Sequence, residues 1–435
     1  MGNIYSEERM KPNAVINKVI LLFFGFTLIF SSLIVNYPNL YTTNEIKIVM
    51  DNDSLKMLEI SGKIHINNNW SDAKIAGICN GSGTYSDPYV IEGLEIDGGN
   101  SGNCILIENS TVFFKIIDCF LFNSVAGDSY PPTGAITLYN VSNGLITQNN
   151  CTFNDAGITI VGDNNSISNN YITDNQIGIL SFGSNNISEN NINGNFGGIL
   201  GMEKAKIFLN NVTNNEDFGI MLAFTQNASI IRNFINNNNK DGIKLLESMY
   251  SNISRNECNN NKFHGICLEA FGGFPSQGYN WISENSVNDN LYGITLNYSE
   301  YNQIINNEVA NNEISGILLD NSDFNNISKN HIEDNDHGIN INASRFNDLI
   351  QNTIKYNNYG ITLTFSCQNR ISHNTLHYNR VCIKDDDYCY NIFENNDCIN
   401  VKDKESDLII PIVITGIILL GLALTLFTYL RYKKN

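Results

Sequence analysis

Residues 316–337 read GILLDNSDFNNISKNHIEDNDH, and residues 338–359 read GININASRFNDLIQNTIKYNNY. Both stretches begin with glycine, continue with alternating apolar residues, and end in the pattern I-x-x-N-x-I-x-x-N, with Leu349 in place of the first Ile of the second copy. The same glycine recurs at Gly157, Gly178, Gly198, Gly219, Gly242, Gly265, Gly293, Gly316, Gly338 and Gly360, with Ala135 one copy earlier and Cys382 one copy later. Successive spacings are 22, 21, 20, 21, 23, 23, 28, 23, 22, 22 and 22 residues. Self-similarity at this period indicates a solenoid.

The apolar residues within each copy alternate, as in Ile243 and Leu245 or Ile361 and Leu363. This period of two, with β-branched residues, is typical of a strand, and no apolar stretch inside the array has helical spacing. The absence of a helical return limb from the pattern argues against leucine-rich repeats. We therefore predict an all-β solenoid in which each coil contains about three short strands and three turns. Stacked coils should form parallel sheets with strands about 4.8 Å apart.

Two columns of asparagine explain how the register is held. The first contains Asn149, Asn170, Asn190, Asn210, Asn233, Asn256, Asn285, Asn307, Asn330, Asn352 and Asn374, and the second Asn154, Asn175, Asn195, Asn215, Asn238, Asn261, Asn290, Asn312, Asn335, Asn357 and Asn379. Asparagine tolerates the left-handed conformation that a corner needs. Stacked amides can also hydrogen-bond from coil to coil as a structural ladder. A slip of one residue would break both ladders and turn the isoleucine rows outward.

These repeats resemble the right-handed parallel β-helices of the pectin-lyase-like superfamily, and most closely the NosD-like proteins of the archaeal surface type. The resemblance covers about residues 61–400 and implies a right-handed parallel β-helix of about 13 coils of about 22 residues. The general preference for right-handed crossovers agrees with that hand. Known members of the superfamily include lyases, hydrolases, phage tailspikes, adhesins and proteins implicated in copper delivery. The repeat is therefore specific for the fold and unspecific for the function.

Both ends of the chain carry apolar segments. Residues 1–35 read as a cytoplasmic N-terminus followed by a signal peptide or a retained signal anchor, because Val19–Val35 is uncharged and follows basic residues. Residues 408–430 are uncharged and long enough for a transmembrane helix, with a basic cytoplasmic tail at 431–435. Between them we expect a connector at 36–60, an N-terminal cap with the first strands at 61–103, the β-helix at 104–400 and a juxtamembrane spacer at 401–407. This organisation places the β-helix outside the cytoplasm at the cell membrane.

The net charge of −18 argues against a nucleic-acid partner, because no basic stripe is present to neutralise phosphates. Ten cysteines in an exported chain suggest disulfides. Cys151 and Cys258, however, fall at inward positions and should be buried as small apolar residues. A denser group could pair near the C-terminal cap: Cys367, Cys382, Cys389 and Cys398. No C-x-x-C motif is present, so a zinc site is not expected.

A catalytic site on this scaffold would need carboxylates or bases gathered over neighbouring coils. The outward row two residues after the glycine has no carboxylate: Thr159, Leu180, Leu200, Met221, Lys244, Cys267, Thr295, Leu318, Asn340 and Thr362. The N-T-D and R-I-K patterns of the resembling hydrolases are also missing. In the row before the glycine, Asp241 and His264 should lie about 5 Å apart on adjacent coils and could act as a base or join a metal site. Solvated turn residues are the commoner explanation of such a pair.

His264 and His337 share a column but should be three coils apart, which is too far for one ion. His331, His373 and His377 share no column, so no copper site is expected. Asp385, Asp386 and Asp387 offer oxygen donors of the kind that Ca²⁺ uses, but nothing else supports such a site. We identify no cofactor and interpret this run as a charged cap.

Binding candidates come from aromatic residues. Tyr250, Tyr279 and Tyr301 are followed in the same column by Phe324 and Phe346, on five successive coils. Facing outward they would form a sugar-binding strip, and facing inward they would fill a corner of the core, which we favour because stacks of this kind commonly pack there. Residues 271–278 form an insertion that explains the spacing of 28 and contains Phe271 and Phe274; it is either a binding loop or a plain surface loop.

The sequence as a whole predicts a membrane-anchored, extracytoplasmic parallel β-helix with a binding or structural role at the cell surface. Surface glycans or surface proteins are the expected partners, besides the membrane itself. The alternatives are a polysaccharide lyase or glycoside hydrolase and, from the resemblance, NosD-like copper delivery.

Overall fold

The computed structural model describes residues 59–125, 132–271, 278–386 and 390–401. The apolar segments predicted at 19–35 and 408–430 lie outside these residues, as does Phe274. Among the residues that are described, none belongs to a helix with the length and hydrophobicity needed to span a bilayer.

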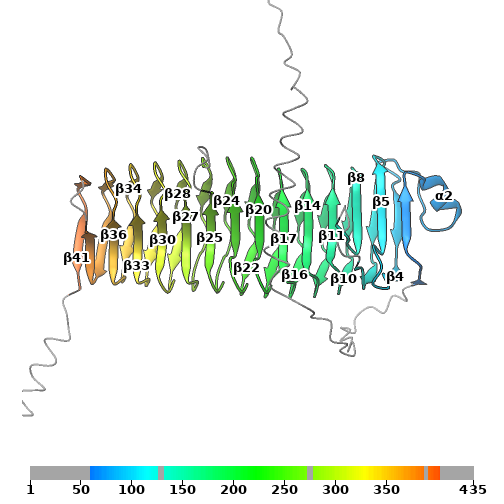
Figure 1. Ribbon diagram of the computed structural model, residues 1–435, viewed down its shortest axis with the longest axis horizontal. Coiled ribbons are helices and arrows are strands. Elements are labelled where there is room, and N and C mark those ends of the chain that lie inside the picture. The colour runs from blue at the N-terminus through cyan, green and yellow to red at the C-terminus, as the bar shows by residue number, and fades with distance from the viewer. Residues whose placement is uncertain (1–58, 126–131, 272–277, 387–389, 402–435) are drawn as a thin grey trace, which may run out of the picture. The chain divides into compact units, whose positions relative to one another are not determined.

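The described chain forms stacked coils, each with up to three short strands, as predicted (Figure 1). Strands of successive coils pair in parallel and build three sheets, which we call A, B and C. Sheets B and C each contain 14 strands, so there is about one coil more than the sequence predicts. The additional coil is formed by strands that precede residue 104, in the segment expected to be mostly cap.

Sheet B has the longest strands. They are β2 (Ile64–Asn67), β5 (Ile105–Ser110), β8 (Ile136–Val141), β11 (Ala156–Val161), β14 (Ile177–Phe182), β17 (Gly197–Met202), β20 (Ile220–Ala223), β23 (Ile243–Leu246), β25 (His264–Glu269), β27 (Tyr292–Asn297), β30 (Ser315–Asp320), β33 (His337–Asn342), β36 (Tyr359–Thr364) and β39 (Val381–Asp385).

Sheet C consists of three- or four-residue strands. They are β3 (Tyr89–Glu92), β6 (Phe114–Ile117), β9 (Gly144–Thr147), β12 (Ser166–Ser168), β15 (Asn186–Ser188), β18 (Lys206–Phe208), β21 (Ser229–Ile231), β24 (Asn252–Ser254), β26 (Trp281–Ser283), β28 (Gln303–Ile305), β31 (Asn326–Ser328), β34 (Asp348–Ile350), β37 (Arg370–Ser372) and β40 (Ile392–Glu394).

Sheet A is divided into two parts. The first contains β1 (Glu59–Ile60), β4 (Leu94–Asp97), β7 (Phe120–Phe122), β10 (Asn150–Thr152), β13 (Tyr171–Thr173), β16 (Asn191–Asn193), β19 (Asn211–Thr213) and β22 (Phe234–Asn236), and the second β29 (Glu308–Ala310), β32 (His331–Glu333), β35 (Thr353–Lys355), β38 (Thr375–Asn379) and β41 (Asp397–Asn400). Single bridges through Glu257 and Ser286 connect β22 to β29, so the face continues across the division.

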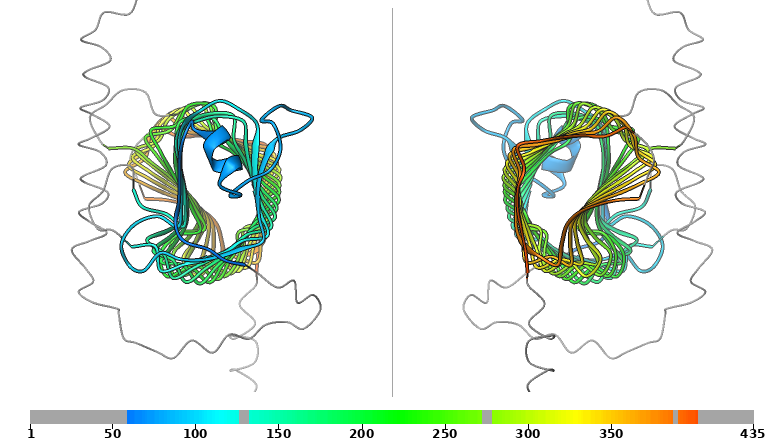
Figure 2. Two further views of the ribbon diagram at one scale, coloured as in Figure 1. Left: turned by 90° about the vertical axis from the view of Figure 1, so that its right-hand side faces the viewer. Right: turned by 90° about the vertical axis from the view of Figure 1, so that its left-hand side faces the viewer.

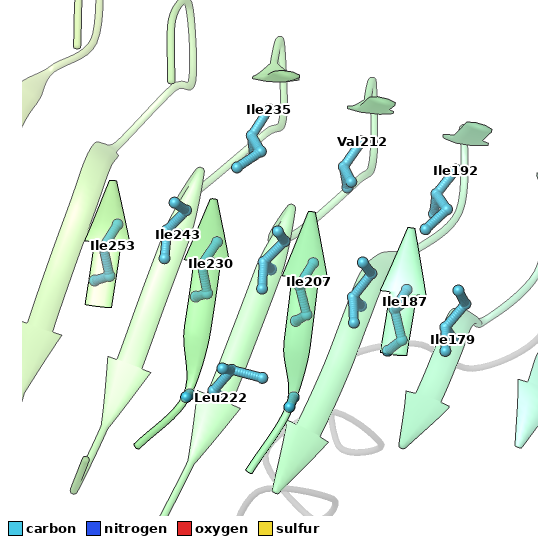
Figure 3. Packing of buried hydrophobic residues seen from close by; sticks show 14 of the residues in the cluster. Ile179, Ile187, Ile192, Ile207, Val212, Leu222, Ile230, Ile235, Ile243 and Ile253 are labelled. Atoms are coloured by element: carbon cyan, nitrogen blue, oxygen red, sulfur yellow. The ribbon is translucent and has the colours of Figure 1, made fainter. Parts of the chain in front are cut away.

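The apolar core runs along the inside of the coils. Inward isoleucines of the three sheets, such as Ile187, Ile192 and Ile179, point toward one another and repeat in register along the stack (Figure 3). All three are fully buried, and so are Cys151 and Cys258, as predicted. Burial of each such isoleucine stabilises the fold by about 1.5–3 kcal/mol relative to an exposed side chain.

Both predicted asparagine ladders are present without a break. Asn330 Nδ2, for example, donates to Asn352 Oδ1 at 3.0 Å, and Asn335 Nδ2 donates to Asn357 Oδ1 at 3.1 Å. The sequence analysis missed a third ladder at the start of the sheet C strands, where Asn325 Nδ2 donates to Asn347 Oδ1 at 3.2 Å. This third column is interrupted in the middle of the chain by Ala205, Ala228 and Ser251, which hid it from the repeat pattern.

The expectation that the ladder asparagines adopt the left-handed conformation is wrong. The residue before each of them does so instead, as at Lys329 (φ 57°) and Asp334 (φ 55°). A ladder amide must point inward to reach buried carbonyls, so the preceding residue turns the chain and directs its own side chain to solvent. That conformation costs an ordinary residue roughly 1–2 kcal/mol, which the ladder hydrogen bonds offset.

The glycine column marks a backbone irregularity in sheet B. Register pairs run from Ser315 to His337 and from Ile317 to Ile339 and pass over the glycines between them. A Cβ on Gly338 would lie 2.6 Å from the carbonyl oxygen of Gly360 and 2.6 Å from a methyl group of Ile354. Both the glycine and the following isoleucine therefore face inward, and the residue before the glycine faces outward.

A short helix covers the N-terminal end of the solenoid. Figure 2 shows α2 (Trp70–Ile75) lying across this opening. Trp70 is buried, stacks on Tyr89 with ring centroids 5.0 Å apart, and donates from Nε1 to Ser110 Oγ at 2.8 Å. The first coil is thus shielded from water by a residue of the predicted cap segment.

Candidate functional site

Three columns of side chains point outward from sheet B. In each long strand they stand one residue before the glycine, two residues after it and four residues after it. Contacts between columns show that they share one face: His337 Nδ1 lies 2.8 Å from Thr362 Oγ1, and Lys244 Nζ lies 2.6 Å from Glu269 Oε2. The outer face of sheet B is therefore the broad surface on which a functional site can be built.

The composition of this face changes along the stack. Coils near the N-terminus fill it with an apolar cluster of Ala156, Ile177, Leu180, Leu200 and Phe218. From Asp241 onward, most outward positions carry a nitrogen or oxygen atom, with Leu246, Cys267 and Leu318 as exceptions up to Thr364. We call Asp241, Lys244 and the outward columns of β25, β27, β30, β33 and β36 the polar strip.

The two residues nominated as catalytic candidates meet in the polar strip. Asp241 Oδ1 lies 2.8 Å from His264 Nδ1 and also accepts the backbone N–H of His264 at 3.3 Å. Their side chains are only 8% and 12% exposed. A carboxylate at Nδ1 favours the tautomer that is protonated there, which makes Nε2 the basic atom of a neutral imidazole.

A lysine and a second carboxylate adjoin this pair. Lys244 Nζ lies 2.6 Å from Glu269 Oε2 and 4.0 Å from Asp241 Oδ2. Burial alone would lower the pKa of Lys244, but the surrounding anionic groups, including Glu269 and Asp241, raise it above its ordinary value. Burial raises the pKa of the nearby Cys267 thiol far above its usual range, so this sulfur stays protonated. Lys244, paired with Glu269, is thus the cation of the site.

Tyr292 completes the cluster, with its ring centroid 5.4 Å from that of His264. Sequence reasoning missed Lys244, Glu269 and Tyr292 as site residues. Glu269 and Asp320 stand in the third outward column, four residues after the glycine, and the shift of the alternation at the glycine obscures this column in the sequence. The column two residues after the glycine has no carboxylate, but the outer face of sheet B as a whole does.

A second polar group lies three coils further along, as the spacing of His264 and His337 predicts. The ring of His337 stacks on Tyr359 with centroids 4.9 Å apart and planes inclined by 14°. Burial lowers the pKa of His337, against the opposing effect of Asp336. This imidazole is therefore biased toward its neutral form.

Between these two groups, three buried polar atoms have no hydrogen-bond partner in the structure: Thr295 Oγ1, Asn297 Oδ1 and Ser315 Oγ. All three side chains belong to outward columns of β27 and β30. Buried polar atoms of folded proteins are normally paired, so this part of the strip has hydrogen-bonding capacity available to a ligand.

The aromatic column faces outward, so the expectation that it fills a corner of the core is wrong. Tyr250, Tyr279 and Tyr301 are 51%, 52% and 38% exposed, and all have positive φ angles at the corner before sheet C. The left-handed backbone directs these side chains to solvent. Their rings stack on one another at 5.3 and 5.1 Å, so each ring covers the face of the next and leaves mainly its edge to a ligand.

Of the insertion residues, Phe271 is half exposed, and its backbone N–H donates to the Glu247 carboxylate. The other nominated residue, Phe274, is outside the described part of the chain. No group of three or more histidine, cysteine or acidic residues that could hold a metal ion occurs among the residues that the structure describes. The donor atoms present there do not fit a copper centre.

Two family profiles match the chain. One, described as the right-handed β-helix region, matches residues 218–376, and the other, described as the periplasmic copper-binding protein NosD, matches residues 123–273. No curated protein sequence matches the chain significantly.

Solved structures of similar architecture include enzymes and a tailspike. The A-module of mannuronan C-5 epimerase AlgE6 from Azotobacter vinelandii is 12% identical over 72% of this chain and 88% of its own, with a TM-score of 0.48. The periplasmic alginate epimerase AlgG is 14% identical over 79% and 85% of the two chains, with a TM-score of 0.43. The Dettilon tailspike protein is 15% identical over 70% and 61%, with a TM-score of 0.44.

These identities and scores are too low to transfer an activity. The profile matches and the stacked parallel coils do agree on the architecture and on its hand. The chain therefore contains a right-handed parallel β-helix region, which the structure extends over stacked coils on both sides of the matched residues, and a segment similar to NosD.

Proposed function

We propose that this protein is an extracytoplasmic β-helix protein that binds an extended glycan along the polar strip of sheet B. The observation that carries the proposal is the predominance of polar side chains in the outward columns from Asp241 to Thr364, with unpartnered buried polar atoms at the middle of the strip. Parallel strands repeat every 4.8 Å or so, and a polymer of sugar units offers hydroxyls at a comparable regular interval. Aromatic rings at Tyr292 and Tyr359 along one edge add apolar contact for sugar rings.

The location outside the cytoplasm is supported by the NosD profile, whose description is periplasmic, and by the apolar segments at both ends of the chain. We include anchoring by residues 408–430 in the proposal. Fractionation of cells that express the full-length chain tests it: the protein should stay with the membrane after a high-salt wash and should become extractable when 408–435 is deleted from a chain whose residues 1–35 are replaced by a cleavable signal peptide.

Glycan binding is tested with a matched pair of double variants on the full-length chain. Asn297→Ala with Asn342→Ala removes two amides from the polar strip, and Gln303→Ala with Asn326→Ala removes two bonded amides from the outer face of sheet C on neighbouring coils. On a glycan array, the first variant should lose binding and the second should keep it. Equal binding by both variants would show that the polar strip is not the binding surface.

Enzymatic cleavage of a polysaccharide is the second candidate, and the contact between Asp241 and His264 favours it. A neutral imidazole held at Nδ1 could remove a proton through Nε2, and Lys244 could stabilise developing negative charge nearby. Incubation with a polysaccharide panel should then release unsaturated sugars or reducing ends, and His264→Asn should abolish the release. Binding without any product would leave a purely binding function.

A further inference from the structure

We infer that the polar strip selects glycans without acidic groups, that is, neutral or amine-bearing sugars, over uronates. This inference rests on the proposed glycan binding and concerns the chemical class of the ligand. It follows from the distribution of charge and of hydrogen-bond acceptors on the outer face of sheet B.

Every cation of the face is already paired with an acid. Lys244 lies 2.6 Å from Glu269 and 4.0 Å from Asp241, and Lys384, in the next coil after the strip, lies 2.7 Å from Asp386. No arginine occupies an outward column of the strip. A uronate carboxylate placed here would have to break one of these pairs or remain unpaired, and an unpaired charge is costly to remove from water.

Carboxylates outnumber cations along the same surface. Asp320 lies in the third column with no cation beside it, and its oxygen accepts from Asn342 Nδ2 at 2.7 Å. Asp336 flanks His337, with 3.5 Å between its Oδ2 and the imidazole Nε2. The local field therefore has the same sign as the net charge of −18, and it repels anionic polymers.

The unpartnered atoms point to the same class of ligand. Asn297 Oδ1, a buried acceptor without a partner, stands in register with the acidic Asp320 on the next strand. Thr295 and Ser315, 4% and 0% exposed, add two hydroxyls without partners. A sugar hydroxyl or ammonium group can donate to Asn297 Oδ1, whereas an ionised carboxylate cannot, and the Thr295 and Ser315 hydroxyls can either donate to a sugar hydroxyl or accept from it. Ser315 stands between Tyr292 and His337 in its column.

Three linear oligosaccharides of equal length test the inference with the full-length chain: a neutral β-glucan, a glucosamine oligomer and a polygalacturonate. Calorimetric titration should show binding of the neutral or amine-bearing oligomer and at least roughly tenfold weaker binding of the uronate. The difference should shrink as salt is added, because exposed charges are screened. Asp320→Asn should also reduce it, while Asp348→Asn, on the exposed outer face of sheet C, should not.

The outcomes separate the two proposals. Binding of the uronate as tightly as the neutral oligomer would overturn the charge selectivity and leave glycan binding intact. A selectivity that is unaffected by salt and by Asp320→Asn would also overturn it. Binding of none of the three oligomers, nor of any glycan on the array, would overturn the proposed function and this inference with it.

Discussion

Asn307 joins three successive coils through a single side chain. Its Nδ2 donates to the carbonyl of Ile282 at 2.9 Å in the preceding coil and to Asn330 Oδ1 at 3.0 Å in the following one. Its Oδ1 accepts from both the backbone N–H and the Nδ2 of Asn285. An amide is the only common side-chain group that can both donate and accept in this way from a fixed position, which is why the column admits no substitution over eleven coils.

The replacement Asn307→Ala should lower the free energy of unfolding by about 2–4 kcal/mol, because it leaves buried carbonyl and N–H groups unpaired. Denaturant unfolding measures the change. The matched control is Asn306→Gly at the exposed neighbouring position, where φ is 56° and glycine fits without strain. A loss as large for Asn306→Gly as for Asn307→Ala would contradict this account of the ladder.

Substitution at the glycine column should be disruptive for a steric reason. Gly338→Ala places a Cβ against the Gly360 carbonyl and the Ile354 side chain, and overpacking of this kind costs about 1–3 kcal/mol. Gly62→Ala is the control, because no atom lies within 4 Å of its added Cβ. Thermal unfolding should show a lowered midpoint for Gly338→Ala alone.

His337 should make stability depend on pH. Its folded-state pKa is lowered by burial, so the unfolded chain takes up the proton more readily. The contribution of the neutral ring to the free energy of unfolding is complete above pH 6.5, the ordinary pKa of histidine. It is lost as the pH falls from 6.5 toward the lower pKa of the folded state. Unfolding measured on both sides of that value should show a smaller acid-induced loss for His337→Gln than for the natural chain. An identical loss would mean that other groups cause it.

At the scale of single elements, the last coil differs from the rest. All described residues of β40 and β41 are exposed, and Asp385 occupies a position that holds Leu363 one coil earlier. A disulfide between Cys382 and Cys398 ties β39 to β41, which confirms one pairing within the predicted cysteine group. Cys367 is also disulfide-bonded, while Cys389 lies outside the described residues. A covalent link thus replaces much of the apolar contact that the terminal coil lacks.

Loss of this disulfide should loosen only the C-terminal coil. A closed loop of about 15 residues contributes on the order of 3 kcal/mol. Hydrogen exchange should therefore show faster exchange in β41 after reduction, or in Cys398→Ala without reductant, while β30 keeps its protection. Cys258→Ala provides the control for loss of a thiol, since this cysteine is buried and unpaired. Unchanged exchange of β41 would mean that the coil is held by its ladders alone.

At the scale of the whole molecule, each coil interacts mainly with its neighbours. The number of coils can therefore change without a change in the register of the strands. Deletion of residues 315–336 removes one complete coil and brings Asn307 into line with Asn352, with all three ladders restored. We expect a folded solenoid that is shorter by about 4.8 Å. Deletion of Ile327 alone removes one residue from β31, inside the constant interval between the ladder asparagines Asn325 and Asn330, so it should put the ladders of this coil out of register and disturb folding of the coils around it. Small-angle scattering and circular dichroism distinguish the two results.

Much of the fold could be predicted from the sequence because the same residue pattern recurs in one coil after another. Nearly every coil repeats the alternation that buries Ile317 and Leu319, and eleven successive coils repeat the amides of Asn330 and Asn335. The candidate site could be predicted only in part. The pair of Asp241 and His264 was found because both stand at one position of the repeat.

The amino-acid sequence by itself determined the coil, its period, the two continuous ladders and the inward rows, because these features depend on spacing along the chain. Only the tertiary structure decided which side chains share the outer face of sheet B and which way the aromatic column points. The inward glycine shifts the alternation of the long strands, which brings Lys244 and Glu269 together with Asp241. The left-handed residue at each corner turns Tyr250 and its neighbours to solvent. Both the shift at the glycine and the outward turn at the corner depend on backbone dihedral angles, which cannot be read from the spacing of residues.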